Sequence, residues 1–438
     1  MNRRALLLIL ATAFIIRLIA VPLVHATRFT SDEREYMFMA KQLLDEGVFR
    51  DSNGDRAIRA PLFPFMLAGI LTLTPTSLLL AHIIGCLLGT VVVGLTYGLA
   101  LRIWTDETGA LLAAGITALY PGLVIYSTLL QTESLYIVFF LLALIAAYRL
   151  WENPQPVLAI GFGVCCGAAA LTRAVFLGFI PILLLLTMWE LRANRRAMIR
   201  IALIALLATA LTIAPWTVRN ARVLHAFVPV ASGGGNALLT GNNPFATGTY
   251  RSGGEFENWF DDELRRRGVE NSAVLSETER SGLSAAIAWS FISEHPGETV
   301  TLAAKKTHVF WFYPITNTDS DVELHLLAVG SDVVLFMASI LGFLSVWFLR
   351  KRLLLPLAAV AFFWLVQTVL HAEARFRLPL IPLLALPAGW GVRILSDPER
   401  RRVLLVDPGF RRSVLVCAVL LAAVYGFTGY LFLRGVIS

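Results

Sequence analysis

The amino-acid sequence predicts an all-α polytopic membrane protein. Of its 438 residues, 57% are hydrophobic and only 15% are charged, whereas soluble domains usually carry about 25% charged residues. Many apolar runs approach the roughly 20 residues that a helix needs to cross a bilayer, and short arginine-containing stretches separate them. A large soluble core does not explain apolar runs of this length and number.

Eleven apolar runs have the length, or nearly the length, of a membrane span. In chain order they cover residues 5–24, 77–103, 108–126, 131–150, 156–172, 174–190, 198–216, 327–349, 353–371, 376–395 and 412–433. The sequence therefore predicts a bundle of about 11 transmembrane helices.

A further apolar run, from Pro61 to Leu73, is too short to cross a bilayer comfortably. If it does not cross, most arginine-rich span ends fall on the same side as Arg3 and Arg4. That arrangement obeys the positive-inside rule, which places basic loops in the cytoplasm. We therefore expect this run to be a re-entrant or juxtamembrane segment on the outer side.

Two long hydrophilic segments then lie on the outer side, residues 27–76 and residues 217–326. The first contains an acidic cluster and the short apolar run. The second opens with glycine-rich turns and continues as charged helical sequence. We expect the whole chain, residues 1–438, to form one transmembrane domain with two outer loops that carry short helices.

The charge and metal-ligand content narrow the class of partner. The net charge of +7 comes mostly from arginines, many of them at the ends of apolar runs, so it does not indicate a nucleic-acid partner. No cysteine or histidine shows metal-ligand spacing, so no ligand set supports a divalent metal. The glycine-rich residues 241–254 lack the strand and lysine of a nucleotide-binding loop. The sequence supports no particular cofactor and leaves metal dependence open; His371, close to Glu373 and Arg375, is the one histidine expected near a site.

The strongest cluster of candidate catalytic residues directly follows the first span. Asp32 and Glu33 begin a predicted helix that Ser31 or Asp32 caps, and Tyr36 follows one turn later. Acidic residues are also favoured in a first helical turn for electrostatic reasons alone. A carboxylate at the outer membrane surface is, however, well placed to accept a proton from a reacting hydroxyl.

The pattern Asp32-Glu33-x-x-Tyr36 resembles the start of the GT-C glycosyltransferases related to the protein O-mannosyltransferases and the lipid A aminoarabinose transferase. Further segments resemble that family in the same order: Arg59-Ala60-Pro61-Leu62, Tyr120-Pro121, Thr132-Glu133, Leu171-Thr172-Arg173, Pro215-Trp216-Thr217-Val218-Arg219-Asn220, Gly241-Asn242-Asn243-Pro244 and Arg375-Phe376-Arg377-Leu378-Pro379. Their order and their common placement outside carry the resemblance, which covers almost the whole chain. Ile58 departs from it, because the aminoarabinose transferase has an acidic residue there.

The resemblance implies a GT-C-type bundle and an inverting sugar transfer from a polyprenyl-phosphate donor. The acceptor would be a hydroxyl or phosphate of lipid A, another glycolipid, a polysaccharide or a protein. Asp32 matches the family's catalytic aspartate, and Glu33 is expected to orient Asp32 or to bind the acceptor. Two close carboxylates are also expected to raise one pKa, which suits a base near neutral pH. The expected location is a bacterial inner membrane, with the site facing the periplasm.

Arg59, Arg375 and Arg377 are the candidate ligands of the donor phosphate, because all three are predicted at the outer membrane surface. Fixed guanidinium groups stabilise the negative charge that grows on a leaving phosphate. The competing interpretation is that these arginines anchor the ends of spans in the lipid headgroups.

Four further residues are candidates for the cavity or the acceptor site, because of their resemblance or their position at the outer ends of spans. They are Tyr36, Glu133, Arg173 and Asn242. A charge at a span end is costly unless it is compensated. Glu133 is therefore expected to pair with Arg173 or, alternatively, with Arg17 inside the first span.

Two other function classes remain open at this point. Intramembrane arginines and glutamates also occur in transporters and in flippases of lipid-linked sugars, but no internal repeat of the transporter kind appears. A polysaccharide polymerase or ligase that uses lipid diphosphates shares the general architecture. The acidic pair directly after the first span favours the monophosphate family, with membrane lipids and a lipid-linked sugar as partners.

Overall fold

The computed structural model describes residues 3–24, 30–250, 254–270, 275–313, 315, 322–345 and 352–406, with parts of 410–426. Its helices are α1 (Arg3–Val24), α2 (Ser31–Asp45), α3 (Leu62–Leu73), α4 (Leu79–Trp104), α5 (Glu107–Leu119), α6 (Pro121–Thr128), α7 (Glu133–Glu152), α8 (Pro156–Thr172), α9 (Phe176–Glu190), η1 (Leu191–Ala193), α10 (Arg195–Leu224), α11 (Gly234–Gly241), α12 (Gly254–Arg266), α13 (Glu277–Glu294), α14 (Pro296–Phe312), α15 (Val322–Ser345), α16 (Leu354–Val369), η4 (Ala374–Leu380), α17 (Ile381–Ser396) and α18 (Pro398–Val406).

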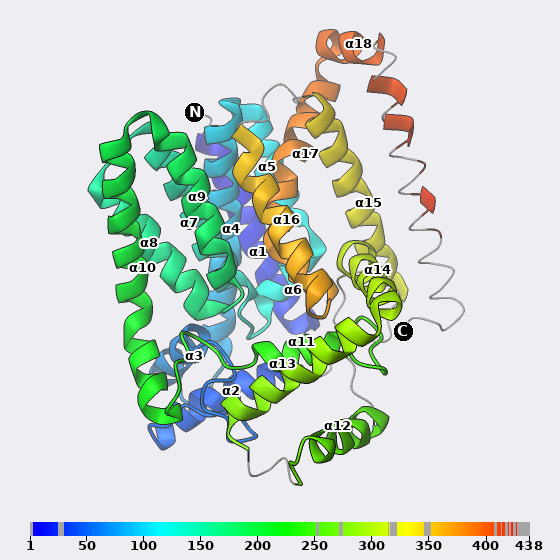
Figure 1. Cartoon of the computed structure of the whole chain (residues 1–438). Coiled ribbons are helices and arrows are strands. Elements are labelled where there is room, and N and C mark those ends of the chain that lie inside the picture. Colours follow the sequence, from blue (N-terminus) through cyan, green and yellow to red (C-terminus); the bar gives the residue numbers. More distant parts are fainter. Residues whose placement is uncertain are drawn as a thin grey trace.

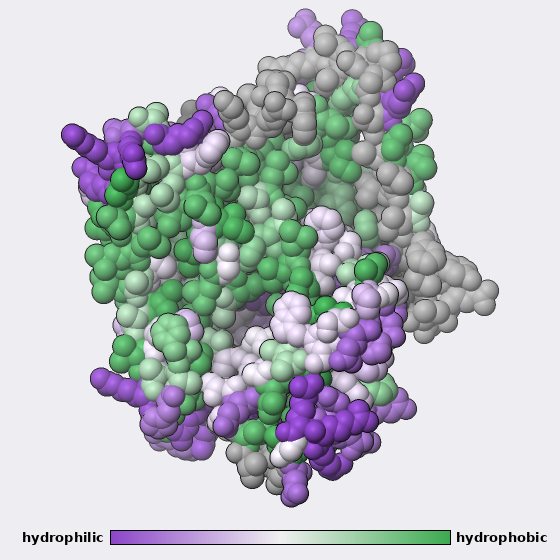
Figure 2. All heavy atoms as spheres, in the orientation of Figure 1, coloured by the Kyte–Doolittle hydropathy of each residue, from purple (hydrophilic) through white to green (hydrophobic). Residues whose placement is uncertain are grey.

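The long helices form an upright bundle, and the shorter helices α2, α3, α11, α12 and α13 gather at one end of it (Figure 1). The N-terminus, the turn between α9 and α10, and α18 lie at the opposite end. An apolar belt covers the middle of the visible face, and hydrophilic side chains gather at both ends (Figure 2). The expected all-helical, multi-pass membrane architecture is therefore confirmed.

The number of spans differs from the prediction. Seven described helices are long and apolar enough to cross a membrane, or eight if α5 and α6, which meet at 56°, form one broken span. The predicted spans 156–172 and 353–371 correspond to α8 and α16, which have only 17 and 16 residues. The predicted span 412–433 lies largely outside the described residues. The count of 11 is therefore not confirmed.

The short apolar run forms α3. Its 12 residues make a helix about 18 Å long, whereas the hydrocarbon core of a bilayer is about 30 Å thick. α3 packs against α2, where the rings of Tyr36 and Phe63 meet edge to face at 5.1 Å. This contact fixes the segment that leads from Arg59 into α3 beside the acidic end of α2.

Small residues let the long helices approach each other closely. A Cβ atom added at Gly163 in α8 would lie 2.4 Å from the carbonyl oxygen of Ala205 in α10. A Cβ atom at Gly342 in α15 would lie 1.7 Å from the carbonyl oxygen of Pro387 in α17. Such backbone contacts are typical of membrane helix pairs, whose association depends on packing because lipid supplies no hydrophobic driving force.

An aromatic cluster connects α7, α9 and α16. The ring of Phe140 lies 6.0 Å from Phe176, 6.2 Å from Phe179 and 5.7 Å from Phe363. Tyr136, one turn earlier on α7, is stacked on Phe140 at 6.1 Å. This cluster supports the helix ends that carry the functional side chains described below.

We predict that Gly163→Ala destabilises the fold and that Gly161→Ala does not. The methyl group at 163 would collide with the α10 backbone, and overpacking of this kind costs about 1–3 kcal/mol. The matched control Gly161 lies on the same helix and has no atom within 4 Å of its added Cβ. Thermal unfolding of both variants in nanodiscs tests this; equal melting temperatures would contradict the close α8–α10 contact.

Candidate active site

Asp32 lies in the first turn of α2 because a capping box fixes the start of that helix. The hydroxyl of Thr30 accepts a hydrogen bond from the amide of Glu33, and the Glu33 carboxylate accepts one from the amide of Thr30. Glu33 also accepts the amide of Leu130 at 3.0 Å, which ties α2 to the segment between α6 and α7. Both contacts hold the side chain of Asp32 toward the neighbouring cavity.

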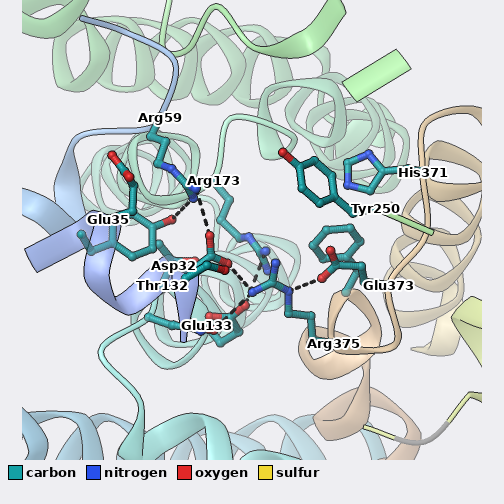
Figure 3. Close-up of a pocket in the computed structure, with 14 residues that line it drawn as sticks. Asp32, Glu35, Arg59, Thr132, Glu133, Arg173, Tyr250, His371, Glu373 and Arg375 are labelled. Atoms are coloured by element: carbon teal, nitrogen blue, oxygen red, sulfur yellow. Dashed lines mark hydrogen bonds and ion pairs between the residues drawn. The ribbon is translucent and has the colours of Figure 1, made fainter. Parts of the chain in front are cut away.

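Two arginines from distant parts of the chain bind the Asp32 carboxylate (Figure 3). Nη2 of Arg59, from the segment before α3, lies 2.9 Å from Oδ1. Nη1 of Arg375, from η4, lies 2.5 Å from Oδ2. Each carboxylate oxygen therefore has its own guanidinium partner, and the ion pairs connect the first outer segment with the late η4 turn.

This environment makes the Asp32 carboxyl group more acidic than that of a free aspartic acid. Burial alone would raise its pKa, but the positive charges and hydrogen bonds of Arg375 and Arg59 outweigh burial and lower it to about 2. The expectation that the neighbouring Glu33 carboxylate raises the pKa of Asp32 is therefore wrong. The physical reason is that Glu33 points away into the helix cap, while both arginines point toward Asp32.

The two arginines are themselves held by further contacts. Nε of Arg375 forms an ion pair with Glu373 at 2.5 Å, and its Nη1 lies 3.4 Å from Oε1 of Gln131. The guanidinium of Arg59 lies over the ring of Tyr36, 5.1 Å from its centroid. Planar arginine forks held in this way are suited to bind phosphate through two parallel hydrogen bonds.

A second ion pair lies beside the first. Arg173, at the end of α8, is 3.5 Å from Glu133, at the start of α7. Arg17 instead donates hydrogen bonds to the backbone carbonyls of Ala13 and Ala118 inside the bundle. The Glu133–Arg173 pairing predicted from the sequence is therefore observed, and the alternative Arg17–Glu133 pairing is not.

These groups line a polar pocket of about 370 Å³ (Figure 3). Its lining is Ser31, Asp32, Glu35, Tyr36, Arg59, Gln131, Thr132, Glu133, Arg173, Tyr250, His371, Glu373, Arg375 and Phe376. We call it the Asp32 pocket. It brings together residues from both outer segments and from the ends of three long helices.

An adjoining cavity of about 300 Å³ shares part of this lining, including Tyr36, Arg59, Arg173 and Phe376. Its remaining walls are mainly apolar: Ile58, Ala60, Tyr136, Ala174, Val175, Ala231, Ala237, Phe363, Leu370 and Pro379, with Thr172 and Gln367. A polar pocket that continues into an apolar cavity offers two different environments to one elongated ligand.

Arg377 does not reach the Asp32 pocket. It is fully buried and forms an ion pair with Asp332 of α15, which also accepts a hydrogen bond from the hydroxyl of Tyr120. Its guanidinium donates in addition to the carbonyls of Phe310 and Tyr313. The expectation that Arg377 binds a donor phosphate therefore needs correction, because a buried carboxylate already neutralises it.

Asn242 and Glu33 also lie outside the pocket lining. Asn242 is buried, accepts a hydrogen bond from Nζ of Lys306 at 2.9 Å and donates to the carbonyls of Leu238 and Val369. It therefore fixes the second outer segment on the end of α16, while Glu33 caps α2. Asn242 therefore has a structural role in place of the expected site role, and Glu33 acts on Asp32 only through the helix cap.

Gln131, Tyr250 and Glu373 are among the pocket residues that the sequence did not predict as site residues. Gln131 and Glu373 stand next to motif residues in the sequence, so proximity to Thr132 and Arg375 was the available signal. Tyr250 gives no local signal; its ring packs on His371 at 5.5 Å only in the folded chain. Burial lowers the pKa of His371, which therefore stays neutral near pH 7.

The described residues contain no group of three or more His, Cys, Asp or Glu side chains placed to hold a metal ion. The carboxylates of the Asp32 pocket are instead engaged by arginines and backbone groups.

Comparison with known proteins supports the fold. The family model described as dolichyl-phosphate-mannose-protein mannosyltransferase matches residues 58–218. This range includes Arg59, Glu133 and Arg173 and excludes Asp32 and Arg375. No curated protein sequence matches the chain.

Solved structures extend the similarity to nearly the whole chain. The oligosaccharyltransferase AglB from Archaeoglobus fulgidus, in complex with an inhibitory peptide and a dolichol-phosphate, superposes with a TM-score of 0.55 and 16% identity, covering 95% of this chain and 55% of that one. The A. fulgidus oligosaccharyltransferase tethered with an acceptor peptide gives 0.57 and 14%, covering 97% and 54%. ArnT from Cupriavidus metallidurans bound to undecaprenyl phosphate gives 0.42 and 15%, covering 92% and 81%.

This chain spans about half the length of the oligosaccharyltransferase. At these identities the comparison shows the fold. The GT-C-type helical bundle expected from the sequence is therefore confirmed.

We predict that Asp32 stabilises the folded chain in a pH range set by its low pKa. The pKa is about 2 in the folded chain and about 3.9 in an unfolded one. The contribution is thus complete above about pH 4 and is lost as the pH falls toward about 2. The melting temperature of the wild type should exceed that of Asp32→Asn by a constant amount from about pH 7 to about pH 5. A difference that disappears within that range would indicate a raised pKa instead.

Proposed function

We propose that this chain is a membrane glycosyltransferase that takes a sugar from a polyprenyl-phosphate donor and transfers it, with inversion, to an acceptor hydroxyl. The observation that carries the proposal is the Asp32 carboxylate held between Arg59 and Arg375 at the junction of a polar pocket and an apolar cavity. The GT-C-type fold and the match to the mannosyltransferase family model support the same reaction class.

The donor phosphate would bind Arg59 and Arg375. Both guanidiniums project into the Asp32 pocket and carry charges that a phosphate can compensate. The adjoining apolar cavity, with Tyr136 and Phe363 in its wall, would take the first isoprenoid units of the carrier. The phosphate would thereby lie at the boundary between the two environments, as an amphipathic lipid requires.

Donor binding would also turn Asp32 into a better base. The carboxylate owes its low pKa to the same two arginines that the phosphate needs. When these arginines turn to the phosphate, the carboxylate stays largely buried but loses much of its compensating charge, so its pKa rises. The protein would thus suppress the base until the donor is in place.

The transfer step then follows in one displacement. The acceptor hydroxyl attacks the anomeric carbon of the sugar and gives its proton to Asp32. The bond between the anomeric carbon and the phosphate oxygen breaks, and polyprenyl phosphate leaves as an anion that the two arginines stabilise. Because the carboxylates of the described pocket do not form a metal-ligand set, we derive no step through a metal ion.

The acceptor would enter beside Glu133, Arg173 and Tyr250. These residues line the part of the pocket next to the arginine pair and come from α7, α8 and the second outer segment. Both outer segments meet at the end of the bundle opposite the N-terminus (Figure 1), and the positive-inside rule would place that end in the periplasm of a bacterial cell. The acceptor would therefore be a glycolipid, glycan or protein of the envelope.

We predict that Asp32→Asn lowers transfer by about 10²–10⁴-fold, because general base catalysis contributes that factor. The same change should leave the affinity for undecaprenyl phosphate unchanged or increase it, because the arginines lose a competing anion. Mass spectrometry of envelope glycolipids and glycoproteins from a complemented deletion strain measures transfer, and titration of the purified protein measures affinity.

Asp32→Asn with full activity would overturn the assignment of Asp32 as the base. A flippase would tolerate the change and would move lipid-linked sugar across proteoliposomes, which makes flux the measurement that separates the two classes. Glu33→Gln is the adjacent control, because its carboxylate caps a helix and does not line the pocket; it should lower stability more than transfer.

We predict that Arg375→Ala weakens donor binding more than acceptor use. Loss of a charge-assisted hydrogen bond costs about 1.5–3 kcal/mol, which corresponds to an affinity about 10- to 150-fold lower. Undecaprenyl phosphate is the probe, and microscale thermophoresis in detergent is the measurement. Arg34→Ala is the matched control, because Arg34 is exposed on α2 and does not line the pocket. Equal affinity in both variants would contradict phosphate binding at Arg375.

A further inference from the structure

A second cavity, of about 640 Å³, lies behind the segment that carries Arg59. Its walls come from the end of α2, the start of α3, the end of α8 and the last turns of α10. It shares no lining residue with the Asp32 pocket. The same loop separates the two cavities: Arg59 lines the Asp32 pocket, and Pro61, two residues later, lines the second cavity. We call this cavity the α10 groove.

The α10 groove is apolar along most of its length. Ten of its lining side chains are hydrophobic or proline: Leu43, Val48, Phe49, Pro61, Leu62, Phe65, Leu171, Pro215, Trp216 and Val223. Phe49 and Trp216 meet edge to face at 4.7 Å, and Phe65 lies 6.0 Å from each of them. Gly47 and Thr212 complete the neutral lining. A hydrocarbon chain fits this environment.

Among the described residues that line the groove, Arg56 and Arg219 are the charged ones. The guanidinium of Arg219 lies 4.6 Å from the ring centroid of Trp216 and 5.6 Å from that of Phe49. It also donates to the backbone carbonyls of Arg56 and Phe49 at 2.7 and 3.1 Å. Stacking and hydrogen bonds therefore hold this positive charge against the aromatic wall of the groove.

The positive charge of the groove is not neutralised by an acidic side chain in its lining. Among the described residues, neither Arg56 nor Arg219 forms an ion pair within 4.0 Å. Glu277, whose charge acts on Arg219, accepts hydrogen bonds from the backbone amides of Arg56 and Ala57 and is not part of the lining. Two guanidiniums against one recessed carboxylate leave a site that favours an anion.

One face of α10 connects the groove with the apolar exterior. Leu207 and Leu211 are 60% and 64% exposed, and Pro215 and Arg219 follow at the same four-residue spacing, so that the four side chains form one continuous row that winds slowly around the helix. Both later residues line the groove. The exposed leucines belong to a helix that is apolar and long enough to cross a membrane. A lipid chain lying along this face would thus lead directly to the two arginines.

We propose that the α10 groove binds one anionic membrane lipid, with its hydrocarbon chain on the aromatic wall and its phosphate on Arg56 and Arg219. The site is separate from the Asp32 pocket, and the inference does not depend on the proposed transfer reaction. Its position suggests a mechanical role, because Arg219 holds the backbone of the same loop that presents Arg59 three residues later. A bound lipid would therefore restrict the motion of the loop that carries Arg59, an ion-pair partner of Asp32.

Photolabelling of the full chain in nanodiscs tests the site. The probes are diazirine-labelled phosphatidylglycerol, which is anionic, and the matching phosphatidylcholine, which is zwitterionic. We expect phosphatidylglycerol to label the peptides around Phe65 and Trp216, and Arg56→Gln to lower this labelling about fivefold, since one arginine contributes about 1 kcal/mol to anionic lipid binding. Arg56 suits the first variant because its side chain is exposed, and its hydrogen bonds with the described residues come from its backbone.

Two further variants and two competition experiments distinguish the alternatives. Arg222→Gln removes an exposed arginine of the same helix that does not line the groove, and it should leave labelling unchanged. Val223→Trp fills the groove and should lower labelling by both lipids. Displacement of the label by inorganic phosphate would show a site for free phosphate, and displacement by undecaprenyl phosphate would reassign the groove to the donor. Either displacement, or equal labelling in Arg56→Gln, overturns the proposal.

Discussion

The shared ion pairing of Asp32 organises the functional end of this protein. Its carboxylate connects α2 with Arg59 before α3 and with Arg375 in η4, which is 343 residues further along the chain. Three separate segments therefore have to be in place before the Asp32 pocket exists. The pairing also sets the chemistry of the pocket, because it keeps a largely buried carboxylate ionised and keeps two guanidiniums oriented toward one point.

A second, fully buried set of charges supports this arrangement from inside the bundle. Arg377 binds Asp332, and Tyr120 donates its hydroxyl to the same carboxylate. Charged groups in an apolar interior cost free energy unless they are paired and hydrogen bonded. The contacts of Asp332 with Arg377 and Tyr120 therefore fix η4 against α15 and the α5–α6 bend. Because Arg375 stands only two residues earlier, its direction toward Asp32 depends on an anchor that makes no contact with the pocket. A pocket-lining arginine and a structural arginine thus stand two residues apart in one short turn.

Outside the bundle interior, the protein presents arginines to two different kinds of cavity. In the Asp32 pocket the guanidiniums face carboxylates, so any phosphate that binds there has to compete with an internal anion. In the α10 groove, Arg219 faces aromatic rings and backbone carbonyls, and the described lining contains no acidic side chain that would compete with an anion. The first arrangement suits a substrate that comes and goes, and the second suits a lipid that stays. One loop, residues 56–62, separates them.

The sequence by itself determined the membrane-spanning helical class, the GT-C-type fold and the candidate carboxylate Asp32, because apolar length and ordered motifs are local properties of the chain. It also placed Arg59, Arg375 and the Glu133–Arg173 pair correctly near one another. Only the tertiary structure decided that Arg377 and Asn242 make buried structural contacts and that Glu33 caps a helix. It also brought Gln131, Tyr250 and Glu373 into the pocket lining. The pKa of Asp32 was likewise out of reach, since it depends on which charges lie within a few ångströms, and neighbours in the sequence such as Asp32 and Glu33 can point in opposite directions.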